Sequence, residues 1–164
     1  MITYYSVWVF HGEGTEEQPY LINSVEDLNM LSKLSNGFLK MNYDGCYFKL
    51  TADLEYDGTE NNFMPISYRF TNITNLSPQF ERYFGGHFDG NGHTISGINV
   101  VNTGTYNSDE VTVGLFALAK NATIKNLTIA NSSFLSKGCD NVALFCIFIT
   151  KKWRKTNIIC NFIA

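Results

Sequence analysis

The stretches HTISGINV, at positions 93–100, and ATIKNLTI, at positions 122–129, decide the fold of this chain. Position 93 aligns with position 122, and the same offset relates VGLFA at 113–117 to VALFC at 142–146. Two separate blocks that share one offset indicate a structural repeat, and a period of about 29 residues is typical of a solenoid. The sequence therefore predicts a mainly β protein, a right-handed parallel β-helix (solenoid).

The shared offset also predicts which side chains stack in the interior. Ile95 is expected on Ile124, and Ile98 on Leu127, while the Asn, Ser and Lys residues between them face water. Each repeat carries too little apolar surface to fold alone, so stacked neighbours must supply the core together.

One segment before the repeats has the pattern of a helix. Val25, Leu28, Leu31 and Leu34 recur at three-residue steps and form one apolar stripe. Ser24 is a good N-cap, Asp27 completes a pair like a capping box, and Asn36-Gly37 supplies a stop. We expect an N-terminal capping helix over 25–34 that covers the first coil.

The remaining segments give a three-part organisation. Residues 1–45 hold the capping helix and two short strands, near 6–10 and 19–22. Residues 46–146 hold the coils, with strands at 46–54 and 63–66 and an insertion at 67–83. Residues 147–164 are expected to be an irregular or truncated tail, because the repeat fails after Cys146. The tail either folds back as a cap or leaves an open C-terminal end through which a homodimer forms.

Composition excludes several classes of protein. The aromatic share of 15% favours strands, and the charged share of 16% is low for an ordinary soluble domain. A net charge of −3 and a single basic block at 151–155 argue against a nucleic-acid partner. No apolar run reaches the roughly 18 residues of a membrane span, and residues 1–10 lack the features of a signal peptide, so an export signal would have been removed or lie upstream.

With these features the chain resembles bacterial surface proteins that carry the GLUG repeat. The resemblance covers roughly residues 8–145 and follows the order of these blocks: GEGTEEQPYLI at 12–22, YFKLTADL at 47–54, PI at 65–66, FDGNGHTI at 88–95, VGLF at 113–116 and TIKNL at 123–127. It implies a right-handed β-helix in exported adhesins, accessory regions of peptidases or modules of undefined role. Ser67 stands where glycine usually follows the Pro-Ile pair, and Ala143 replaces the glycine of the second VGLF block.

Candidate chemistry is sparse in this chain. His87, Asp89 and His93 lie close together in the sequence, but Asp89-Gly90-Asn91-Gly92 has the composition of a tight turn, so we expect a turn and neither zinc nor calcium. No catalytic residue, metal ligand or cofactor site is predicted. Four cysteines are expected to be buried and small, with a Cys139–Cys146 disulfide as the alternative.

Two further residue groups are candidates for surface roles. Asn-x-Ser/Thr triplets begin at five asparagines, which are expected at outward strand positions and turn ends: Asn72, Asn75, Asn121, Asn126 and Asn131. Five aromatic residues in loop-like stretches either stack on sugar rings or pack the insertion onto the coils: Tyr68, Phe70, Phe80, Tyr83 and Tyr106.

These patterns favour a non-catalytic structural or adhesion module of a secreted or cell-surface bacterial protein, with a host glycan or cell-surface ligand as its partner. The alternative is the N-terminal fragment of a carbohydrate-active β-helix enzyme, of the polysaccharide lyase or glycosidase type, whose active site is not in this chain. Acidic or basic residues clustered on consecutive coils would discriminate the two.

Overall fold

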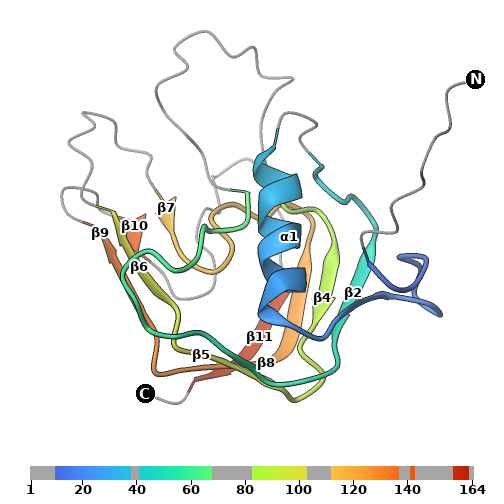
Figure 1. Ribbon diagram of the computed structural model, residues 1–164. Helices are drawn as coiled ribbons and strands as arrows, with labels where there is room; N and C mark the ends of the chain where they lie inside the picture. Colours follow the sequence, from blue (N-terminus) through green and yellow to red (C-terminus); the bar gives the residue numbers. More distant parts are fainter. Residues whose placement is uncertain are drawn as a thin grey trace, which may run out of the picture.

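The computed structural model describes residues 10–37, 41–67, 83–102, 112–136, 141–142 and 157–162. The described part is mainly β, with one helix and parallel sheets (Figure 1). In chain order its elements are β1 (Tyr20–Ile22), α1 (Val25–Asn36), β2 (Tyr47–Leu50), β3 (Leu54–Glu55), β4 (His87–Asp89), β5 (Thr94–Ser96), β6 (Asn99–Asn102), β7 (Thr112–Val113), β8 (Thr123–Ala130), β9 (Ser133–Ser136), β10 (Asn141–Val142) and β11 (Asn157–Phe162).

The helix predicted over 25–34 is confirmed as α1, which continues to Asn36. The Ser24 hydroxyl accepts a hydrogen bond from the Asp27 amide at 3.2 Å, which satisfies one of the free N–H groups at the helix start. Leu28 and Leu31 are fully buried, and Val25 and Leu34 pack against the same core. The helix ends before Gly37 as expected, but Gly37 has a φ of −71°, so this end does not use the left-handed glycine cap.

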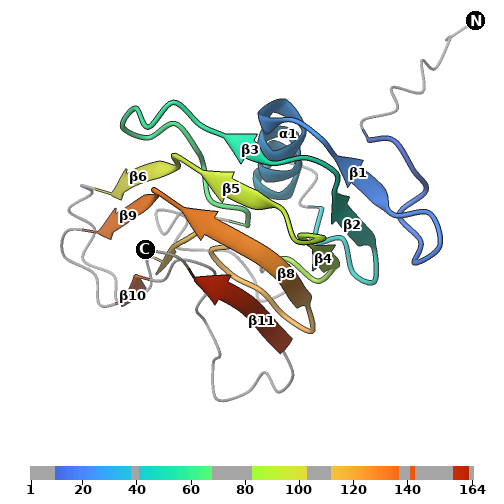
Figure 2. The same ribbon diagram turned by 90° about the horizontal axis from the view of Figure 1, so that it is seen from below.

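The strands pair in parallel between segments far apart in the chain. The main sheet has the order β1-β2-β4-β8-β5-β3, with β11 also paired to β8, and two smaller sheets pair β6 with β9 and β7 with β10. Each of these named pairs is parallel. Figure 2 shows α1 at the β1 and β3 end of the sheet and β11 at the opposite end. This arrangement is compatible with a parallel β-helix.

The predicted interior register is wrong for the first repeated block. Ile95 lies opposite Ile129 and not Ile124, and Ile124 lies opposite Phe88 instead. Val100, which the shared offset placed on Ile129, lies opposite Phe134. The second block is confirmed at its first residue, because Val113 pairs with Val142 as the offset predicts.

The pairing of β4 accounts for the shifted register, because β4 lies opposite residues 123–125 and leaves the later part of β8 for β5. The turn at 90–93 separates β4 from β5, whereas the matching strand positions in β8 are separated only by Asn126 and Leu127. Gly90 is required in this turn, since a Cβ there would lie 2.4 Å from the Asn126 carbonyl oxygen. The backbone therefore matches Thr94-Ile95 to the second Thr-Ile pair of β8, although the first pair fits equally well by sequence.

Other strand predictions were confirmed in part. The strand expected at 19–22 is β1, and the one expected at 46–54 is divided into β2 and β3. At 63–66 the structure has a single parallel bridge, from Ile66 to Phe116, in place of a strand. The strand expected at 6–10 lies outside the described residues except for Phe10, and the insertion at 67–83 lies outside them except for its two end residues.

The expectation of an irregular tail is wrong for Asn157–Phe162. This segment forms β11, which pairs in parallel with β8 and has one irregularity after Ile159. Asn157 lies opposite Thr123, at the same spacing in the chain as Ile95 and Ile129. The absence of Gly and turn residues in this stretch removed the usual sequence signals, but the open edge of β8 provided a template for pairing.

Ser67 combines backbone strain with an unpaired polar atom. It has a φ of +60°, in the left-handed region that costs a residue with a side chain roughly 1 kcal/mol, and its buried hydroxyl has no hydrogen-bond partner. Its amide donates to the Ser35 hydroxyl at 3.1 Å, a bond that glycine would keep.

We expect Ser67→Gly to raise the free energy of unfolding by about 1 kcal/mol, because it removes both costs and only part of the gain is lost to unfolded-state entropy. Ser67→Ala is the matched control, since it removes the hydroxyl but keeps the strain. Urea denaturation of both variants measures the difference. A Gly variant no more stable than the Ala variant would contradict the role of the backbone angle.

Candidate functional site

The acid and histidine stretch at 87–93 does not assemble a site. The His87 ring stacks on Tyr47 with centroids 4.4 Å apart, whereas His93 Nδ1 lies 3.0 Å from Asp53 Oδ1. Asp89 accepts hydrogen bonds within its own turn, from the Asn91 amide. Within the described ranges no three His, Cys, Asp or Glu side chains gather closely enough to hold a metal ion.

We expect a chelator to leave the melting temperature unchanged, because His87, Asp89 and His93 each have separate structural partners. Thermal melts with and without EDTA, and with added calcium or zinc, measure this. An upward shift of several degrees on adding either metal would show that a site forms, since a ligand that binds the folded state stabilises it.

Several neighbouring groups stabilise the charged form of Asp89. Its partial burial alone would raise its pKa, but hydrogen bonds from the Asn91 amide and the Asn126 side chain, together with the Lys125 ammonium 3.5 Å away, hold that pKa below its ordinary value. A lowered folded pKa adds stability above the unfolded value of roughly 3.9 and loses it as pH falls through the folded value.

We therefore expect Asp89→Asn to flatten the loss of stability as the pH falls below the unfolded value of roughly 3.9, because the wild-type carboxylate must then take up a proton. Glu55→Gln is a control that changes net charge equally at an exposed position. Urea midpoints measured across this pH range would test the expectation. Parallel acid profiles for wild type and Asp89→Asn would contradict it.

Tyr83 is the one sugar-stacking candidate among the described residues. Its hydroxyl donates to Asp44 Oδ2 at 3.1 Å, and the Lys120 ammonium lies 4.6 Å from its ring centroid. The ring is half-buried and is already engaged by these two partners. The other four candidates lie outside the described residues: Tyr68, Phe70, Phe80 and Tyr106.

Three of the five Asn-x-Ser/Thr asparagines lie at an outward strand position or at bends, as predicted: Asn126 is within β8, and Asn121 and Asn131 flank it. Asn121, Asn126 and Asn131 are exposed and have φ values of 54°, 53° and 46°. Asparagine is favoured in this left-handed region because its side chain hydrogen-bonds locally. Asn72 and Asn75 lie outside the described residues, as do Cys139 and Cys146, while Cys46 is a free, half-buried thiol.

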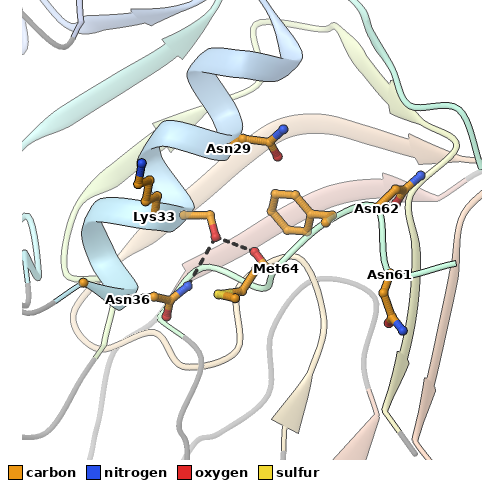
Figure 3. Close-up of a pocket in the computed structure, with 9 residues that line it drawn as sticks. Asn29, Lys33, Asn36, Asn61, Asn62 and Met64 are labelled. Atoms are coloured by element: carbon orange, nitrogen blue, oxygen red, sulfur yellow. Dashed lines mark hydrogen bonds between the residues drawn. The ribbon is translucent and has the colours of Figure 1, made fainter. Parts of the chain in front are cut away.

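A groove with a volume of about 420 Å³ lies between α1 and the segment 61–64. Figure 3 shows Asn29, Lys33 and Asn36 on the helix, and Asn61, Asn62 and Met64 on the facing segment. Nine residues line it: Asn29, Ser32, Lys33, Asn36, Gly37, Asn61, Asn62, Phe63 and Met64. Its volume is in the range of small-ligand pockets.

Hydrogen bonds from α1 fix one wall of the groove against the other. The Ser32 hydroxyl donates to the Met64 carbonyl oxygen at 2.5 Å, and Asn36 Nδ2 donates to the Pro65 carbonyl oxygen at 2.8 Å (Figure 3 draws the first). Phe63 is buried in the core, whereas the Met64 side chain is 48% exposed. These hydrogen bonds from the helix therefore fix the two walls of the groove relative to each other, as precise binding requires.

The asparagine side chains of the segment that faces α1 form hydrogen bonds to the backbone of a neighbouring segment. Asn62 Oδ1 accepts from the Asn99 amide at 2.9 Å, and Asn62 Nδ2 donates to the Gly97 carbonyl oxygen at 2.9 Å. Asn61 Oδ1 accepts from the Val101 amide at 2.8 Å. These side chains thus pair backbone groups along the edge of β6, which fixes their own orientation.

Asn29 is oriented by a buried tyrosine. The Tyr56 hydroxyl donates to Asn29 Oδ1 at 3.0 Å. Burial, with a contribution from Glu26, raises the pKa of Tyr56 well above its ordinary value, so this hydroxyl stays a donor. The amide nitrogen of Asn29 therefore remains on the exposed side of the helix.

The sequence did not indicate this groove. The helix was predicted only as a cap. The residues between the strands expected at 46–54 and 63–66 carry no motif that marks binding. The partners of Asn29, Asn61 and Asn62 come from distant parts of the chain, apart from a bond within the loop from Asn62 to Asp57. Only the clustering of asparagine at 61–62 could have drawn attention to it.

Fold and groove together define a mainly β protein of stacked parallel strands with a polar groove beside its helix. No protein-family model matches the chain. It is 32% identical over 126 residues to halomucin from Haloquadratum walsbyi, a match that covers 76% of this chain and 1% of that protein. A crystal structure of a candidate immunoglobulin A1 protease from Bacteroides ovatus superposes with a TM-score of 0.62 at 21% identity.

The structural match covers 94% of this chain and 40% of the Bacteroides ovatus chain, and at this identity it shows the fold alone. The chain thus spans 1% of the length of halomucin and 40% of the Bacteroides ovatus chain. In the described residues no helix is long and apolar enough to cross a membrane.

Proposed function

We propose that this chain is a non-catalytic structural or adhesion module of a secreted or cell-surface bacterial protein, built as a right-handed parallel β-helix of the GLUG-repeat type with α1 as its N-terminal cap. One observation carries the proposal: parallel pairing runs from β1 through β2, β4 and β8 to β11. Such pairing builds long, flat faces and suits a protein that spaces or presents surfaces.

The relatives support a modular role within a larger protein. The chain matches a segment of halomucin that is 1% of that protein's length, as a repeated or modular unit would. The Bacteroides ovatus protein likewise contains more than this fold. A host glycan or other cell-surface ligand is the partner class we propose.

Bead adhesion tests the function directly. Beads coated with the folded chain are expected to stay on glycan-coated wells under flow, whereas beads coated with heat-unfolded chain are washed off. The same wells are assayed for new reducing ends or unsaturated sugar products. Release of either product by the folded chain would overturn the non-catalytic assignment and support the carbohydrate-active alternative, and equal retention of both kinds of bead would overturn the adhesion function.

A further inference from the structure

We propose that the groove between α1 and residues 61–64 binds a carboxylate-bearing sugar residue of a glycan. This inference rests on the proposed adhesion function and assigns it a place and a ligand class. Three properties of the groove support it: the direction of the amide groups, the charge of the lining and the backbone groups that are already paired.

The amides that line the groove present donors outward. Asn29 uses its oxygen to accept from the Tyr56 hydroxyl, and Asn61 uses its oxygen to accept from the Val101 amide. Each is therefore left with its NH₂ group for a ligand. Asn62 has its oxygen and its nitrogen engaged inside the fold and offers nothing further.

The charge of the residues that line the groove also favours a ligand that accepts hydrogen bonds. Lys33 is exposed and is the one charged residue among the nine that line the groove. In Figure 3 its side chain extends from the same helix as Asn29 but points away from residues 61–64, so it adds positive charge at the rim of the groove. Donors and a cation without a carboxylate favour an anionic acceptor such as a sugar carboxylate and disfavour a metal ion.

The walls of the groove suit a sugar residue better than a peptide strand. The carbonyl oxygens of Met64 and Pro65 already accept from Ser32 and Asn36, so this segment lacks the free edge that an added strand needs. The half-exposed Met64 side chain offers an apolar surface for the C–H face of a sugar ring. A volume of about 420 Å³ suits a small ligand.

Three probes of matched length test the ligand class: trigalacturonate, neutral galactotriose and triglutamate. Amide NMR titrations of the whole chain report both affinity and location. Trigalacturonate is expected to bind at least about tenfold more tightly than the other two and to shift the signals of Asn29, Lys33 and Asn61. Binding of triglutamate as tight as that of trigalacturonate would overturn the sugar assignment, and equal binding of galactotriose would overturn the requirement for a carboxylate.

Paired isosteric variants test the location. The double variant Asn29→Asp and Asn61→Asp keeps the oxygens that Tyr56 and Val101 use but replaces both outward NH₂ groups by carboxylate oxygen, so trigalacturonate should bind about 10- to 100-fold more weakly. The control, Asn121→Asp with Asn131→Asp, makes the same change in net charge at exposed turns and should bind within about twofold of wild type.

The outcomes separate this inference from the proposed function. Equal loss of binding in both double variants, or no loss in the groove variant, overturns the groove as the site. Beads coated with the groove variant that still adhere to glycan-coated wells as wild type does would also overturn it, while leaving adhesion itself intact. A circular dichroism spectrum and melting temperature close to wild type show that the groove variant is folded.

Discussion

Phe88→Ala should destabilise the protein by about 3–5 kcal/mol, a large part of the total stability of a domain of this size. Phe88 is 1% exposed, lies opposite Phe48 and Ile124 in adjacent strands, and meets the Phe116 ring edge-to-face at 5.4 Å. Its truncation leaves a cavity bounded by strands on both sides, and paired strands cannot collapse to fill it.

Denaturant unfolding measures this loss, and Leu135→Ala is the control, because Leu135 is a strand residue that is 46% exposed. The control should change stability by no more than about 0.5 kcal/mol. A loss below about 1 kcal/mol for Phe88→Ala would mean that Phe88 does not fill the interior between β2 and β8.

Leu31→Ala should cost about 2–5 kcal/mol, because Leu31 is fully buried where α1 covers the core. The neighbouring residue gives a matched control: Met30 is on the same helix but is 36% exposed. Met30→Ala removes a side chain of similar volume, so any change in helix propensity is nearly the same in both variants.

Urea melts of the two variants compare burial at adjacent positions. If Leu31→Ala costs no more than an ordinary surface substitution, about 0.5 kcal/mol, or if Met30→Ala costs as much as Leu31→Ala, then α1 is not a cap on the core. Because Ser32 and Asn36 hold the groove from the same helix, a detached α1 would also abolish the groove.

The two halves of the molecule differ in what they offer a partner. The sheet is built from parallel strands that come from distant parts of the chain, while the groove lies between α1 and residues 61–64. The groove variants and the core variants therefore report on separate properties, ligand binding and stability.

The sequence by itself determined the features that depend on near neighbours in the chain. Ser24, Asp27 and the three-residue spacing of Leu28 and Leu31 specify α1, because capping and apolar contacts in a helix join residues three or four apart. The turn at 90–93 is likewise encoded locally, by the positive φ angles of Asn91 and Gly92 and by the hydrogen bond from the Asn91 amide to Asp89. The parallel β class followed from the repeated blocks, even though the offset was wrong for one of the two.

Only the tertiary structure decided which repeats stack and where a groove forms. Thr94-Ile95 matches two Thr-Ile pairs in β8 equally well by sequence, but β4 lies opposite the first pair, so β5 pairs with the second. Residues 157–162 carry no turn signal, yet they pair with the edge of β8. The groove depends on hydrogen bonds between residues far apart in the chain, such as Ser32 with Met64 and Asn61 with Val101. Local patterns cannot encode such contacts, because their geometry exists only once the coils have stacked.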